Sequence, residues 1–216
     1  MQVSHAIHER RSTRAFTSEA VPSELVKQLL EVARWAPSWA NSQAWNIFVV
    51  TGEALERLKA TMTERAESDV PAHPDLPMPP REWPEYLSAR MTGRPAASEA
   101  PDGQARPATG PSVWEFWGAP CVLLLAIDEL LEPRYACLDA GILAQTICLA
   151  AEDRGLSTCI MATAVRHADV LHELIPAAEN MRFVVGIAIG QADHTAVVNR
   201  GERKRVDLDE LVTWID

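Results

Sequence analysis

One segment limits the possible folds more than any other: residues 135–156, YACLDAGILAQTICLAAEDRGL. The helix that this segment predicts is apolar on nearly every side, and Gly155 marks its end. A helix of this kind needs other elements around it, so we expect it at the centre of the molecule. The chain has 216 residues, enough to build a core around it, and we expect a single domain over residues 1–216.

Other segments show the periodicities of helices and strands, but in no regular βαβ order. We therefore expect an α+β fold. Helices are expected at residues 4–11, 21–37, 53–68 and 167–175, and strands or extended segments at residues 46–50, 119–127, 157–162 and 182–190. Residues 203–215 predict an extended segment with a short helical turn.

Residues 68–112 have a different composition, since they hold ten of the fifteen prolines. This stretch is too long and too rich in proline for a compact connection. It is either a disordered linker or an excursion over a functional site. Trp83, Tyr86 and Leu87 are residues that disordered linkers seldom carry, and they favour a partly ordered lid at about 68–112.

The formal net charge of −10 argues against nucleic acid or an anionic membrane as a partner. The four cysteines are widely spaced, and the N-terminus has no apolar stretch behind its charges. This pattern predicts reduced, mostly buried thiols in a cytoplasmic protein. The histidines show no zinc-binding spacing, so we expect no metal site.

Basic residues gather near the two ends of this acidic chain. Arg10, Arg11 and Arg14 lie in RRSTRAF, and Arg200, Arg203, Lys204 and Arg205 lie close to the C-terminus. Each cluster alone could be a solvated surface. If folding brings the two together, they form a pocket for a small anion, with phosphate the first candidate.

Together, RRSTRAF and the later APSWANSQAW resemble the nitroreductase family of flavoproteins. That family opens with R-R-S-x-R-x-F, then V-P and an amphipathic helix, then A-P-S-x-x-N-x-Q-x-W before a strand. CLDAGILAQTICLAAEDRGLSTC, VVGIAIGQAD and RKRVDLDELVTW resemble its C-terminal half. The resemblance leaves out only about 65–112. It implies a mixed central sheet flanked by helices, in an intertwined homodimer with FMN at the interface.

The resemblance also implies which residues bind FMN. Arg10, Arg11 and Ser12 are expected to meet the phosphate and ribityl chain, with Arg203 and Arg205 on the far side; Lys204 is an alternative to either. Arg14 is expected near the N1–C2 edge of the flavin, where a cation raises the reduction potential. Pro37, Ser38, Trp39 and Asn41 would come from the other subunit, and Ile160, Met161, Ala162 and Thr163 would lie along the dimethylbenzene and N5 side.

Two features leave alternatives open. Gln145, in the predicted central helix, could reach the ribityl chain or cap a loop internally. Relatives often have a polar or basic residue before the strand at 119–127, whereas this chain has Val113, Trp114, Glu115, Phe116 and Trp117. These aromatic residues could pack in the core or shape a substrate pocket.

The implied activity is transfer of hydride from NADH or NADPH, through flavin N5, to nitroaromatic or quinone-type substrates in a ping-pong cycle. No acid or base side chain is required, so no catalytic residue is expected. Two alternatives remain. The same fold could support reductive dehalogenation or ring oxidation, or the chain could bind flavin without turnover.

Overall fold

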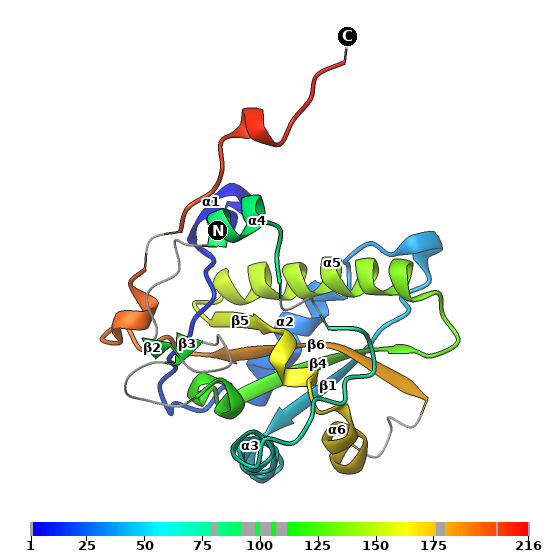
Figure 1. Cartoon of the computed structure of the whole chain (residues 1–216), viewed down its shortest axis with the longest axis vertical. Coiled ribbons are helices and arrows are strands. Elements are labelled where there is room, and N and C mark those ends of the chain that lie inside the picture. The colour runs from blue at the N-terminus through cyan, green and yellow to red at the C-terminus, as the bar shows by residue number, and fades with distance from the viewer. Residues whose placement is uncertain are drawn as a thin grey trace.

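The computed structural model describes residues 2–78, 82–91, 98–99, 105–106, 112–175, 180–201 and 203–215. The predicted lid at 68–112 therefore lies partly outside the described residues. The expected α+β class is confirmed, with helices on both faces of a sheet (Figure 1). Among the described residues, no helix has the length and apolar character needed to cross a membrane.

A sheet of four strands forms the middle layer. In the order β1-β4-β6-β5 the strands are Asn46–Thr51, Cys121–Asp128, Met181–Gly190 and Ser157–Met161. All three strand pairs are antiparallel, whereas a mixed sheet was expected. One parallel contact is present: the N-terminal segment runs parallel to β5 and pairs with it at an isolated bridge between Ser12 and Thr158, without forming a full strand.

Helices α2 (Ser23–Ala33) and α5 (Pro133–Glu152) cover one face of the sheet, and α3 (Gly52–Glu67) and α6 (Ala168–Leu174) cover the other (Figure 1). Strand β4 is buried on both faces. Leu123 and Leu125 pack with α2 and α5, while Val122 and Leu124 join the core on the α3 side. This two-sided burial explains the unbroken apolar run of β4 in the sequence.

The apolar helix α5 packs on the sheet and α2, while part of its outer side stays exposed in a single chain, so the prediction that other elements surround it is met only in part here. Its sheet-facing residues, such as Leu143 and Ile147, are fully buried, but Tyr135 and Leu138 are exposed. The described elements of a single chain do not cover this outer apolar side. Gly155 ends the helical region as predicted, in a left-handed conformation with φ of 70°.

The remaining elements are short. They are α1 (Val3–Glu9), η1 (Trp39–Asn41), α4 (Glu85–Met91), β2 (Ser98–Glu99), β3 (Ala105–Arg106), η2 (Val113–Gly118), η3 (Ala162–Val165), η4 (Val197–Asn199) and η5 (Leu208–Glu210). The C-terminal segment leaves the body beside α1 and extends as an arm (Figure 1). Leu208, Leu211, Trp214 and Ile215 on this arm are exposed.

Candidate functional site

The two ends of the chain meet along strand β5 and the end of β6. The N–H of Thr13 donates to the carbonyl of Thr158 at 2.9 Å, and the N–H of Thr17 donates to the carbonyl of Gln191 at 2.9 Å. The N–H of Asp193 returns a bond to the carbonyl of Ala15 at 3.0 Å. These backbone bonds hold residues 13–17 in place, so the basic RRSTRAF stretch is a fixed part of the fold.

The alternation of side chains along this segment separates a buried face from an accessible one. Thr13 is 1% exposed, whereas its neighbours Ser12 and Arg14 are half-buried. Neighbouring residues of an extended segment point to opposite sides. Ser12 and Arg14 therefore lie on the side opposite Thr13, where a ligand can reach them.

The predicted meeting of the two basic clusters is found in the structure. The Arg203 guanidinium donates to the backbone carbonyls of His8 and Arg10. Partial burial, followed by the positive charges of Arg11 and Arg10, lowers the pKa of the Arg203 guanidinium. Arg205, which donates to the carbonyl of Lys204 at 2.8 Å, adds a smaller repulsion.

Two carboxyl groups, those of Glu9 and Glu152, lie within the electrostatic reach of these arginines. Burial, with the negative charge of Glu9, raises the pKa of Glu152 at the end of α5, against the opposing charges of Arg10, Arg11 and Arg203. Within the described part of the chain, none of the five arginines expected at the site forms an ion pair. Cations crowded together with no described carboxylate at ion-pair distance form a strong site for an anion.

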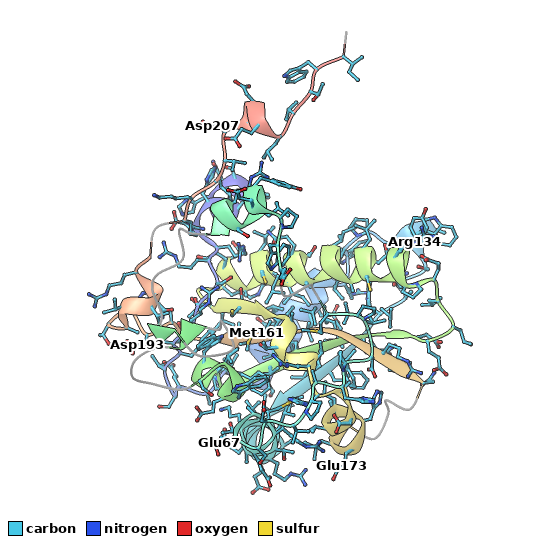
Figure 2. The ribbon with its side chains drawn as sticks, in the orientation of Figure 1. Glu67, Arg134, Met161, Glu173, Asp193 and Asp207 are labelled. Atoms are coloured by element: carbon cyan, nitrogen blue, oxygen red, sulfur yellow. The ribbon has the colours of Figure 1, made fainter. Side chains whose placement is uncertain are left out.

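Residues 160–163 continue β5 into η3, directly after the point where Ser12 pairs with Thr158. Ile160 is 39% exposed, Met161 is buried, and Ala162 is exposed. Figure 2 shows Met161 near the middle of the molecule, where β5 ends. A Cβ atom on Gly186 would clash with the Cβ of Ala164, so η3 packs directly on the backbone of β6. This packing fixes the course of the 160–163 segment.

The loop of Pro37, Ser38, Trp39 and Asn41 lies elsewhere in the chain. The N–H of Trp39 donates to the carboxylate of Asp139 at 3.0 and 3.1 Å, near the start of α5. The arginine cluster faces Glu152, thirteen residues further along that helix, which is about 20 Å at 1.5 Å per residue. One chain therefore does not bring the loop to the arginines.

The two open alternatives have different outcomes. Gln145 is half-buried, and its side chain makes no hydrogen bond to another described residue, so the internal cap is not found. Trp114, Phe116 and Trp117 are buried in the core cluster under β4, which agrees with core packing rather than a pocket wall. The carbonyl of Trp117 accepts the N–H of Phe16 at 3.1 Å, so this group also supports the basic segment.

The sequence analysis did not identify two residues of the site region. Asp139 is a buried carboxylate within the apolar helix α5, and an acid in the middle of such an apolar run was an available signal. Asn199 is buried beside Arg11 and Arg14. Its importance depends on contacts across 185 positions of the chain, which no local pattern shows.

Comparisons with known proteins agree with the family resemblance of the sequence. The model of the nitroreductase family matches residues 7–191. The chain is 32% identical to 4-nitrobenzoate reductase of Pseudomonas putida over 89% of this chain and 86% of that protein. It is 32% identical to chloronitrobenzene nitroreductase of Comamonas testosteroni over 97% and 95%.

A solved structure from the same family has a similar fold. The FMN-dependent nitroreductase NfnB from Mycobacterium smegmatis, in complex with NADPH, superposes with a TM-score of 0.86 at 29% identity, over 100% of both chains.

Proposed function

Because this chain belongs to the nitroreductase family, we propose that it is an FMN-dependent oxidoreductase that uses NADH or NADPH to reduce nitroaromatic compounds. The observation that carries the proposal is the cluster of arginines from both chain ends, which have no ion-pair partner among the described residues. An acidic protein that holds these cations together is suited to bind a doubly charged phosphate.

The donor set fits FMN. Arg10, Arg11, Ser12, Arg203 and Arg205 would hold the phosphate with forked and hydroxyl donors. Arg14, on the same side of the extended segment as Ser12, would face the N1–C2 edge of the flavin, where its charge favours the reduced form. Residues 160–163 would lie along the dimethylbenzene and N5 side, with the N–H of Ala162 facing N5. Gln145, whose side chain has no hydrogen-bond partner in the described part of the chain, would reach the ribityl chain.

We further propose that a second copy of the chain completes the site. The loop with Pro37, Ser38, Trp39 and Asn41 lies about 20 Å along α5 from the arginine cluster, so it would serve the flavin of a partner subunit. Trp39 is 65% exposed, with Tyr135 and Leu138 exposed beside it on α5. An apolar surface of this kind, together with the apolar C-terminal arm, supports a homodimer.

Bound FMN would supply the redox chemistry by accepting a hydride from the nicotinamide and delivering electrons to the substrate. The residues of this chain would hold and cover the cofactor, and none needs to act as an acid or base. If the nicotinamide and the substrate use one cleft in turn, the kinetics are ping-pong. Quinones would accept the same electrons as the nitroaromatic compounds. A cytoplasmic location and a lid formed by residues 68–112 remain predictions.

Rapid mixing of the FMN-loaded protein with NADH or NADPH tests the proposal. The flavin absorbance should bleach with a rate that saturates with nicotinamide concentration, and 4-nitrobenzoate should then restore it. Bleaching no faster than free FMN with the same nicotinamide would overturn the reductase assignment and favour a flavin-binding protein without turnover. Recovery with halogenated but not nitrated aromatics would favour the dehalogenase alternative.

A further inference from the structure

We infer that Asn199 is a positioning residue that fixes Arg11 and Arg14 for the cofactor. This inference rests on the proposed function, because it concerns how the FMN site is held in shape. Asn199 ends the short helix η4 and is 8% exposed, which is unusual for an asparagine. A buried amide is stable only if its donors and acceptor find partners.

The side-chain amide of Asn199 joins the two ends of the chain. Its Oδ1 accepts the backbone N–H of Arg14 at 2.8 Å. Its Nδ2 donates to the carbonyl of Ala15 at 2.8 Å and to the carbonyl of Asp193 at 2.9 Å. The amide thus uses both donors and one acceptor position, a combination that no carboxylate or hydroxyl side chain offers.

The main chain of Asn199 makes a further contact. Its carbonyl accepts Nη1 of Arg11 at 2.9 Å, which directs this guanidinium toward the C-terminal segment. One residue therefore fixes the backbone of Arg14 and the side chain of Arg11, and both belong to the proposed cofactor site. The Arg203 contacts to His8 and Arg10 join the same two segments at a second point.

The position of Arg14 matters for the flavin because charge interactions depend on distance. The energy of a cation near the N1–C2 edge depends on its separation from the charge that reduced flavin carries there. Without the Asn199 amide, the backbone at Arg14 loses one partner and Ala15 loses another, so the segment can shift. The flavin would then lose part of the stabilisation of its reduced form.

A double-mutant cycle on the FMN-loaded protein tests this inference. The variants are Asn199→Ala, Arg14→Ala and the double variant, and the readouts are the midpoint potential of bound FMN and its dissociation constant. We expect Asn199→Ala to lower the potential and raise the dissociation constant about tenfold, equivalent to one or two lost hydrogen bonds. The double variant should lower the potential no further than Arg14→Ala alone.

Asp75→Ala is the matched control. Asp75 is half-buried and also joins distant segments, since its carboxylate accepts the N–H of Phe183 at 2.8 Å and contacts His172 at 3.0 Å. It lies away from the arginine cluster, so its loss should reduce stability and leave the flavin potential unchanged. If Asn199→Ala does not fold, Asn199→Asp retains the acceptor for Arg14 but loses both donors, and it should lower the potential as well.

Two results would overturn the inference: an Asn199 variant with the potential of the unmodified protein, or fully additive shifts in the double variant. Failure of the proposed function looks different, because the unmodified protein would then bind no FMN or would not be reduced by either nicotinamide.

Discussion

The backbone N–H of Trp39 and the carboxylate of Asp139, one hundred positions apart, are joined by hydrogen bonds of 3.0 and 3.1 Å. The loop around Trp39 needs such an anchor, because Ala40, Asn41 and Gln43 all have positive φ angles near 50°. Non-glycine residues in this region are strained, and they keep the conformation only when their surroundings hold it. The buried carboxylate provides this support from α5.

Asp139→Ala should therefore loosen the loop. Loss of the acceptor leaves the N–H of Trp39 without its partner, at a cost of about 1–3 kcal/mol in the free energy of unfolding. If the loop covers the flavin of a partner subunit, FMN should also bind more weakly. Asp139→Asn, which retains an acceptor oxygen, serves as the control in chemical unfolding and FMN titration. Equal stability and affinity for the alanine variant and the unmodified protein would contradict this role.

The exposed aromatic residues of the proline-rich segment predict an effect on substrate selection. Tyr86 on α4 is 62% exposed and stacks with Arg90 at 5.6 Å, and Arg90 pairs with Glu210 of the C-terminal arm at 3.6 Å. If α4 belongs to a lid, Tyr86→Ala should lower kcat/KM for a nitroaromatic about two- to tenfold, the value of one aromatic contact. The dissociation constant of FMN should not change.

Steady-state kinetics with two nitroaromatics of different size would check this prediction, with Leu130→Ala, a change at an exposed apolar residue outside the proposed site, for comparison. An unchanged kcat/KM for every substrate would remove Tyr86 from the lid hypothesis.

His167 predicts a loss of stability in mild acid. It is buried, its ring lies 5.9 Å from that of Trp114, and its Nδ1 has no hydrogen-bond partner among the described residues. Burial, with Arg166 and Arg65 and against the opposing charge of Asp169, lowers the pKa of its imidazole. The unfolded chain therefore binds a proton that the folded chain excludes. The stability from neutral His167 is complete above about pH 6.5 and is lost as the pH falls through the folded value.

Urea unfolding at pH 7.5 and 5.5 measures this effect. The free energy of unfolding should fall between these pH values in the unmodified protein and fall less in His167→Phe, which keeps a ring against Trp114 but cannot titrate. An identical pH dependence in both proteins would show that His167 does not carry the effect.

Much of the fold was predictable because the local patterns are strong. The uniform apolarity of β4 and α5 and the proline boundaries of α2 identified these elements, and the structure confirms them. The antiparallel pairing of the strands was not predictable from their composition. Nor was the partial exposure of α5, because the apolar residues Tyr135 and Leu138 look the same in sequence whether the chain itself or a partner covers them.

The candidate site was predictable only in part. The charge clusters and the resemblance identified the arginines, and the meeting of Arg203 with His8 and Arg10 agrees with that prediction. Asn199 and Asp139 were not predicted, because their function lies in contacts with residues far away in the sequence. Direct contact of the predicted residues with a flavin remains a prediction.

The most direct test of the account is a titration of the protein with FMN, in which Arg10→Ala and Arg203→Ala are compared with Arg200→Ala. Arg200 also donates to backbone carbonyls, those of His194 and Thr195, but lies outside the proposed site. We predict that the first two variants raise the dissociation constant at least about tenfold, since each loses a charge-assisted contact of about 1.5–3 kcal/mol. Arg200→Ala should match the unmodified protein. Equal FMN affinity in all four proteins would contradict the claim that the two chain ends form one cationic site for the cofactor.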